Sequence, residues 1–292
     1  MNNTRNNSLK YGLIVVMLSF AINVIFYMQF SLDETVFLKH YYERDIHDGS
    51  FMIIHFISNS NDNRKINEIS FPQMPDDFAS VVFNDFSNNF DNGYYRAENF
   101  AHYNYNELMI EFRYNDKNYD VENNEESIIL NKAVIKYNNG DIQEIDIGKI
   151  VLHKNMNYYD FIDSTYSSSS NNFTASTVME SQKNIIIENI ESVLDKETSG
   201  FMELKLNGVK TEELKYPISV NMGDSLNFDN KFLYHLDDMR KYNVYDVEKR
   251  LLISDSEGNK GYEVIRNLDY YPIEFFLTEK GISEFLKYIG VK

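Results

Sequence analysis

Hydrophobic and polar positions follow three different patterns along the 292-residue chain. Residues 11–30, YGLIVVMLSFAINVIFYMQF, carry no charged side chain. The long middle part contains many short apolar runs separated by Asn, Asp and Gly, a pattern typical of β-strands and turns. Near the end, Ile282, Phe285, Leu286 and Ile289 recur at helical spacing before a glycine, which predicts a short C-terminal helix.

Residues 11–30 predict a transmembrane helix. At about 1.5 Å per residue, a helix of this length measures about 30 Å, which matches the hydrocarbon layer of a bilayer. A cleavable secretory signal is the alternative, because Ser19-Phe20-Ala21 offers small residues at a spacing suited to cleavage. Cleavage there would leave the apolar residues 22–30 exposed at the new terminus, so we favour an uncleaved anchor.

The charges beside this segment indicate its orientation. Arg5 and Lys10 precede the segment, whereas Lys39 and Arg44 follow it, so the positive-inside rule favours a cytoplasmic N-terminus by a small margin. The short tail, residues 1–10, favours the same orientation, because moving its cations across a membrane is unfavourable. We therefore expect a single-pass protein of the cell membrane with a cytoplasmic tail and an extracytoplasmic body.

Residues 31–50 are expected to form a juxtamembrane stalk or a short helix. Ser31 and Glu34 stand at the spacing of a capping box, in which each side chain satisfies a backbone N–H at the start of a helix. Val36, Phe37 and Tyr41 would lie along one side of that helix.

Two later segments predict β-hairpins. In NKAVIKYNNGDIQEIDIGKIVLHK, residues 131–154, apolar and polar residues alternate on both sides of an Asn-Gly turn. Ile142 is out of phase with the isoleucines that follow it, and a β-bulge near Gln143 would restore the register. In residues 201–208, FMELKLNG, the same alternation leads into a second Asn-Gly turn.

The predicted fold is mainly β, with two tandem antiparallel β-sandwiches of Ig-like type behind the transmembrane helix and a short helix at the C-terminus. The first sandwich is expected over residues 51–162 and the second over residues 179–292. Between them, residues 163–178 are rich in serine and poor in apolar side chains, so a linker or exposed loop is expected there. One elongated β-domain that contains this stretch as an internal loop is the alternative.

Composition narrows the class of protein. The chain has no cysteine, which excludes disulfides, thiolate metal ligands and a cysteine nucleophile. The part from Ser31 onward has 26 basic and 45 acidic residues, because Arg5 and Lys10 are the only charged side chains before it, and its net charge is therefore −19. We expect no binding to nucleic acid, and we interpret the charge as one that keeps an exported domain soluble.

The motif Gly223-Asp224-Ser225-Leu226 resembles the active-site motif of a large family of serine esterases with an α/β fold. The resemblance implies a nucleophilic Ser225 whose Asp and His partners come near the end of a long catalytic domain. Here 67 residues follow Ser225, the later histidine is His235, and no Asp stands three positions before it. The period-two alternation around the motif instead predicts Ser225 on the polar face of a strand, so we interpret the match as chance.

Other candidate sites have a simpler structural explanation. On a helix, His40, Glu43 and His47 would share one face and offer ligands to a zinc-like ion, but a polar stalk face is the better interpretation. The Asp/Asn-rich segments 59–63 and 255–261 are similar to calcium loops in composition only, and we expect solvated turns.

The sequence therefore predicts no catalytic, cofactor-binding or metal-binding residue. We expect a protein that acts by binding, as an accessory of a membrane complex or a surface module, with the lipid bilayer as a partner through residues 11–30 and a protein partner in or near the membrane. A membrane-tethered hydrolase or a binder of cell-envelope carbohydrate, with tyrosines that stack on sugars, is the alternative. Asn172-Phe173-Thr174 fits a glycosylation acceptor in a compartment that glycosylates.

Overall fold

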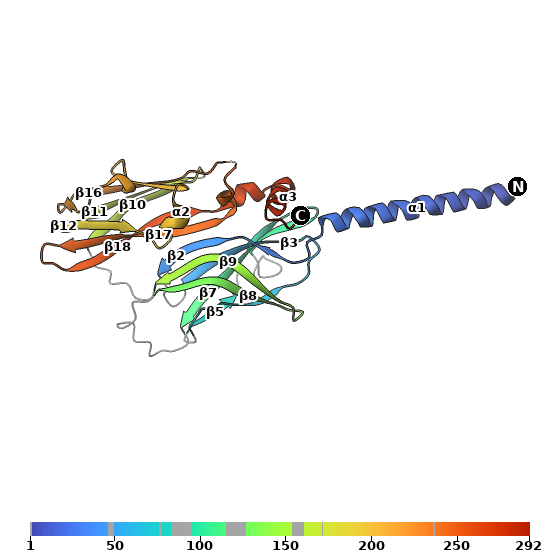
Figure 1. Cartoon of the computed structure of the whole chain (residues 1–292), viewed down its shortest axis with the longest axis horizontal. Helices are drawn as coiled ribbons and strands as arrows, with labels where there is room; N and C mark the ends of the chain where they lie inside the picture. Colours follow the sequence, from blue (N-terminus) through green and yellow to red (C-terminus); the bar gives the residue numbers. More distant parts are fainter. Residues whose placement is uncertain are drawn as a thin grey trace.

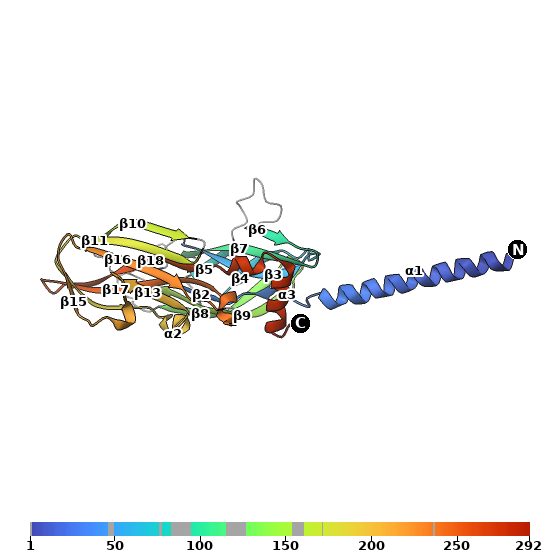
Figure 2. The same ribbon diagram turned by 90° about the horizontal axis from the view of Figure 1, so that it is seen from above.

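The computed structural model describes residues 2–45, 50–75, 78–82, 95–114, 127–153, 161–170, 172–235 and 237–292. Strands make up 53% of the chain and helices 19%, which confirms the mainly β prediction. The molecule is an elongated β body from which one long helix projects (Figures 1 and 2).

The N-terminal half contains one helix and nine strands among the described residues. In chain order they are α1 (Asn2–Phe30), β1 (Val36–Phe37), β2 (His40–Asp45), β3 (Ser50–Asn59), β4 (Ile66–Ser70), β5 (Phe78–Val82), β6 (Tyr95–Asn99), β7 (Tyr103–Tyr114), β8 (Ile128–Tyr137) and β9 (Ile142–His153). The C-terminal half continues with β10 (Ile162–Ser170), β11 (Thr174–Ser181), β12 (Ile185–Glu191), α2 (Asp195–Thr198), β13 (Met202–Leu206), β14 (Val209–Lys210), η2 (Thr211–Glu213), β15 (Ile218–Val220), β16 (Ser225–Phe232), η3 (Met239–Tyr242), β17 (Val244–Asp255), β18 (Lys260–Tyr270), η4 (Pro272–Phe276) and α3 (Glu279–Tyr288).

Helix α1 is long and apolar enough to cross a membrane. Its apolar part, Lys10–Phe30, has a mean hydropathy of 2.1 and no buried position in its most apolar window. The helix begins at Asn2, so the predicted tail is a continuation of the same helix. At its other end, Lys292 Nζ donates to the carbonyl oxygens of Gln29 and Ser31 at 2.6 and 2.9 Å, which places the C-terminus at the base of α1 (Figure 1).

The strands form three sheets. The central one has eight strands in the order β15-β12-β17-β2-β9-β8-β4, with β18 paired to β17. The other two have five strands each, one built on β1-β3-β7-β5 with β6 paired to β7, and one ordered β10-β11-β16-β13-β14. Most pairs are antiparallel, but β2 is parallel to both of its neighbours, β17 and β9.

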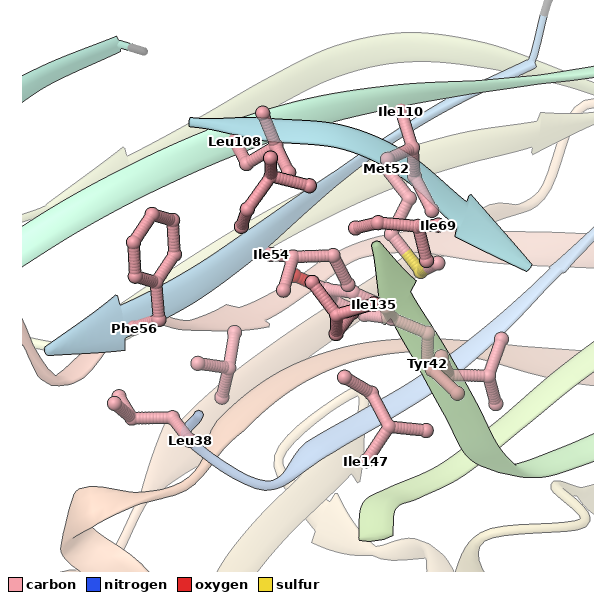
Figure 3. Packing of buried hydrophobic residues seen from close by; sticks show 14 of the residues in the cluster. Leu38, Tyr42, Met52, Ile54, Phe56, Ile69, Leu108, Ile110, Ile135 and Ile147 are labelled. Carbon is pink, nitrogen blue, oxygen red and sulfur yellow. The ribbon is translucent and has the colours of Figure 1, made fainter. Parts of the chain in front are cut away.

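Each five-stranded sheet covers one face of the central sheet and closes one hydrophobic core. Adjacent residues of β9 show this, because Ile150 belongs to the core under the β3/β7 sheet and Val151 to the core under the β11/β16 sheet. Figure 3 shows the first core, in which Tyr42, Ile54 and Ile147 from three strands converge.

The two cores are not separate modules. Strand β2 from the N-terminal half lies between β9 and β17, so one sheet serves both cores. Helix α3 also packs its Ile282, Phe285 and Leu286 into the first core, although it comes from the end of the chain. The structure therefore does not confirm two tandem Ig-like sandwiches. It does confirm the C-terminal helix and the three buried positions predicted for it, whereas Ile289 is 39% exposed.

The structure differs from the stalk or helix predicted for residues 31–50. Residues 31–45 enter the body as β1 and β2, and Leu38 and Tyr42 are buried in the first core; residues 46–49 lie outside the described residues. The physical reason is the period-two pattern of His40–Asp45, HYYERD, whose alternate side chains face the two cores of the central sheet. Pairing with β9 on one side and β17 on the other supplies hydrogen-bond partners for its backbone along both edges.

Residues 163–178 also differ from the predicted linker. They form most of the β10–β11 hairpin, with pairs from Ile162↔Ser181 to Ser170↔Thr174. Strand β10 lies at the edge of its sheet, so backbone hydrogen bonds hold it while its serines face solvent and no apolar face is required.

The two predicted hairpins are present as β8–β9 and β13–β14. In the first, the expected bulge near Gln143 is wrong. Gln143 pairs regularly with Ile135, and the irregularity lies between Leu130 and Lys132 instead. The register shift therefore lies near the start of β8 and the end of β9, away from the Asn-Gly turn.

Candidate functional site

The β10–β11 hairpin borders two adjoining hollows in the surface. The smaller has a volume of about 210 Å³ and the larger about 490 Å³. Both are lined by Ser169, Ser170, Thr174, Ala175 and Asn230. We call the two hollows together the hairpin site. The serine-rich composition that suggested a linker thus supplies the hydroxyl groups of this site.

The smaller hollow extends to the end of strand β18 in the central sheet. Phe173 from the hairpin turn, and Asp269 and Tyr271 from the end of β18 and the residues after it, complete its lining. Burial raises the pKa of the Asp269 carboxyl and of the Tyr271 phenol. The hollow therefore combines an aromatic ring, a phenol and a carboxyl group that is held partly away from water.

Asn230 is the polar side chain that this arrangement leaves unsatisfied. It occupies an inward position of β16, in phase with the buried Phe228 and Phe232, and is itself only 4% exposed. Its Oδ1 is buried and has no hydrogen-bond partner in the described part of the chain. Leaving such an acceptor unpaired costs about 1–3 kcal/mol, and a donor of a ligand that reached it would recover this amount.

Phe173 adds backbone strain at the same place. Its φ of 59° lies in the left-handed region, where a bulky residue is rare. The conformation is held by Phe173 N–H donating to Ser170 O at 3.1 Å and by Phe232 N–H donating to Phe173 O at 3.0 Å. The ring packs against Tyr270 and Tyr234, with centroids 4.6 and 5.5 Å away. Strain of this kind concentrates at binding and catalytic sites, where surrounding contacts maintain it.

The larger hollow has a balanced charge. Its lining contains Glu203, Lys205, Asp229 and Lys231 beside the hydroxyl groups of Ser168 and Ser176, in addition to the shared residues. Lys205 Nζ pairs with Glu203 at 3.1 Å. Because cations and carboxylates occur in equal number, the lining favours a neutral polar ligand over a phosphate or another anion.

Hydroxyl groups both donate and accept hydrogen bonds, whereas the Asn230 Oδ1 and the carboxylates only accept. A ligand that carries many hydroxyl groups and one apolar face satisfies both sets and packs on Phe173 or Tyr271. The chemistry of the hairpin site is therefore that of binding a sugar-like molecule.

The esterase-like motif lies in a turn. Gly223 has a φ of 83°, Asp224 accepts a hydrogen bond from Asn221 N–H at 2.8 Å, and Ser225 is the exposed first residue of β16. Leu226 and Phe228 are buried, as the alternation predicts. Met222, which the same alternation places inside, is 70% exposed, because the turn interrupts the strand before it.

The possible metal ligands are separated by the strand. His40 and Glu43 point to opposite sides of β2, and His47 lies outside the described residues. His40 Nε2 accepts a hydrogen bond from His55 N–H at 2.9 Å, and burial lowers the pKa of His40 well below its usual value. Among the residues that the structure describes, no group of three or more His, Asp or Glu side chains is arranged to hold a metal ion.

The two segments that are similar to calcium loops are turns closed by their own side chains. The Asp255 carboxylate accepts from the backbone N–H groups of Glu257 and Asn259, both at 2.9 Å. In the other segment, Asp62 Oδ1 accepts from the Arg64 backbone N–H at 2.9 Å, and the Asn59 side chain bonds both the N–H and the carbonyl of Leu32, just after α1, at 2.7 and 2.8 Å. In both segments, oxygens that a calcium ion would need are engaged in hydrogen bonds within the chain.

The glycosylation sequon lies in the turn of the hairpin site. Thr174 Oγ1 donates to Asn172 Oδ1 at 2.7 Å, so the two residues that define the sequon are in contact. Sequence patterns identified the sequon, but neither the hairpin turn nor Asn230 and Phe173 as site residues. The period-two phase of β16 was the available signal, because it places a polar Asn among buried phenylalanines.

Comparison with known proteins adds little to this description. No family model and no curated protein matches the chain. Among solved structures, the crystal structure of a protein of unknown function from Porphyromonas gingivalis W83 aligns with 80% of this chain and 95% of its own, with 6% sequence identity and a TM-score of 0.23. At this score the similarity supports no inference, so function must be argued from the residues.

Proposed function

We propose that the chain is a single-pass membrane protein whose β body lies outside the cytoplasm and binds a neutral, hydroxyl-rich ligand, such as a glycan of the cell envelope, at the hairpin site. The observation that carries the proposal is the buried, unpartnered Oδ1 of Asn230 in a hollow lined by hydroxyl groups. The apolar Lys10–Phe30 part of α1, whose most apolar window has no buried residue, supports the anchor, and the cations of the short tail support the orientation.

The ligand class follows from the polar groups that remain to be satisfied. A protein surface would have to present several hydroxyl or amide groups into two small hollows, whereas an oligosaccharide carries them on every ring. The net charge of −19 from Ser31 onward argues against acidic polysaccharides, because like charges repel at low ionic strength. Neutral glycans therefore fit the site best.

The test uses the full-length protein in detergent micelles. Glucose and N-acetylglucosamine oligomers of two to six units serve as probes, and thermal unfolding is followed by tyrosine fluorescence, because the chain has 22 Tyr and no Trp. A ligand at about 100 times its Kd stabilises the folded state by about 2.7 kcal/mol, which raises Tm by several degrees. We expect such a shift for at least one oligomer series.

Variants locate the binding. Asn230→Ala is expected to abolish the ligand-induced shift while changing the unliganded stability by less than about 1 kcal/mol, because loss of packing offsets removal of an unpaired acceptor. Asn189→Ala, outside both hollows, is the control and keeps the shift. If no oligomer changes Tm, and photo-crosslinking from α1 captures an integral membrane protein, the accessory role in a membrane complex replaces this proposal.

A further inference from the structure

A second polar cluster lies at the carboxyl ends of the parallel strands β2 and β9, and none of its residues lines the hairpin site. Its members are Glu43 from β2, His153 at the end of β9 and Ser127, the residue before β8. The β8–β9 ladder, with Ile128 opposite Leu152, brings Ser127 beside His153. In the β2–β9 ladder Glu43 lies opposite Val151, two residues before His153 on the same face, and its side chain reaches His153 diagonally.

Two hydrogen bonds connect the three side chains in series. Ser127 Oγ lies 2.6 Å from His153 Nδ1, and His153 Nε2 lies 3.0 Å from Glu43 Oε1. Glu43 also accepts from the Val193 backbone N–H at 3.1 Å and from the Ser192 hydroxyl. The carboxylate is thus fully engaged, and its orientation is fixed from three directions.

These contacts define the proton positions. Burial by itself would raise the pKa of Glu43, but the hydrogen bonds from His153, Ser192 and Val193 outweigh it and lower the pKa. An ionised carboxylate only accepts hydrogen bonds, so His153 must carry its proton on Nε2. The lone pair of a neutral His153 is then on Nδ1, and it faces the hydroxyl of Ser127.

Exposure to solvent increases from Glu43 through His153 to Ser127. Glu43 is 0% exposed and His153 is 3% exposed, whereas Ser127 is exposed. A network that only held the 192–194 turn against the sheet would need Glu43 and its backbone contacts. It would not need a solvent-facing hydroxyl aligned with the free nitrogen of the histidine. This order of nucleophile, base and orienting carboxylate is the one that activates a serine.

We infer that Ser127, His153 and Glu43 form an acyl-transfer centre that hydrolyses carboxylic esters. Ser127 Oγ attacks the ester carbonyl carbon while its proton passes to His153 Nδ1. The tetrahedral intermediate collapses, and the departing alcohol takes that proton. Water then attacks the acyl-serine in the same way, and the acid leaves as Ser127 Oγ recovers a proton from His153. Glu43 is the positioning residue, and it stabilises the imidazolium that forms between the steps.

The position of Ser127 indicates the kind of ester. Ser127 is exposed and lines neither hollow of the hairpin site, so it suits a small acyl group on an accessible alcohol. This activity is independent of glycan binding at the hairpin site.

The first experiment labels the full-length protein in detergent with a fluorophosphonate and measures hydrolysis of p-nitrophenyl acetate. We expect the label on Ser127 by tandem mass spectrometry, and its loss together with an at least hundredfold lower rate in Ser127→Ala. Ser225→Ala is the matched control, because Ser225 is also exposed, and it should behave as wild type. Label on other serines, or an unchanged rate in Ser127→Ala, would overturn the inference.

The second experiment measures activation of the nucleophile directly and uses the absence of cysteine in this chain. Ser127→Cys introduces a single thiol, whose alkylation by iodoacetamide reports its thiolate fraction. At pH 6.5 we expect it to react at least ten times faster than the thiol of Ser225→Cys. Adding His153→Gln should remove the difference, and adding Glu43→Gln should shift the pH profile of alkylation upward.

Folding is checked in each variant by tyrosine fluorescence. Since Ser127 and Ser225 are both exposed, the two cysteine variants compare like with like even if substitutions at the buried His153 or Glu43 reduce stability. Equal alkylation rates in folded Ser127→Cys and Ser225→Cys would refute an activated nucleophile.

Discussion

The fold disfavours the ionised form of the Asp45 carboxyl group. Burial, together with the neighbouring Glu248 carboxylate and against the opposing effect of Arg250 and Arg266, raises its pKa to about 7. Its Oδ1 is buried without a hydrogen-bond partner in the described residues. Replacing Asp45 by Asn keeps the shape of the side chain and removes the ionisation, so the Asp45→Asn variant isolates this contribution.

The magnitude follows from the two states of the side chain. An unfolded Asp has a pKa of about 3.9, and below that pH both states hold the proton and stability is unaffected. As pH rises from about 4 to 7, the unfolded state releases its proton first, so folding becomes less favourable; above about 7 the loss is complete. Three pKa units correspond to about 4 kcal/mol, and about 1.5 kcal/mol of this is present at pH 5.

The assay is urea unfolding of the full-length protein in detergent, followed by tyrosine fluorescence at pH 5 and pH 8. The advantage of Asp45→Asn over wild type should grow by about 2–3 kcal/mol between these pH values. The exposed Asp163→Asn controls for the loss of one negative charge. A difference that stays constant with pH, or a variant less stable than wild type at pH 8, would refute the reasoning.

Three further predictions test the fold and the anchor. Gly148→Ala should destabilise the protein by more than about 2 kcal/mol in urea titrations, because φ is +100° and a Cβ would lie 2.4 Å from His40 O. Ile54→Ala should lower the unfolding free energy by about 2–5 kcal/mol, since Ile54 is fully buried in the core of Figure 3; Ile142→Ala, at a 66% exposed position, is the control. Deleting residues 2–30 should move the protein from the carbonate-resistant membrane fraction to the soluble fraction, and persistence in the membrane would contradict the anchor.

The elements that sequence patterns predicted correctly are those whose signal is local. The apolar helix, the β8–β9 hairpin with its Asn-Gly turn and the amphipathic helix α3 each depend on residues a few positions apart. Strand β2 was missed because its hydrogen-bond partners, β9 and β17, lie far away in the sequence. Capping signals at Ser31 and Glu34 favoured a helix, and this non-local pairing overrode them.

The candidate sites show the same limit. Ser127 and His153 are 26 positions apart, and His153 and Glu43 are 110 apart, so no spacing rule connects them. Glu43 was considered as a metal ligand, but together with His40, which lies on the other face of β2. The four-letter motif around Ser225 was conspicuous, yet the structure aligns a histidine and a carboxylate with a different serine. Such a site depends on which side chains become neighbours in space, and strand register determines this whereas composition does not.

Strand β2 connects the stability argument to the proposed acyl-transfer centre. Asp45 is two residues after Glu43 on the same face and pairs across the ladder with His153, so its negative charge at pH 8 lies next to the imidazole that accepts a proton in the proposed reaction. The negative charge of Asp45 then lowers the stability of the fold while it favours proton transfer to His153, a trade-off that is common at functional sites. Adding Asp45→Asn to Ser127→Cys should raise the unfolding free energy at pH 8 and slow alkylation of the thiol. A stabilised protein with an unchanged alkylation rate would show that Asp45 affects only the fold.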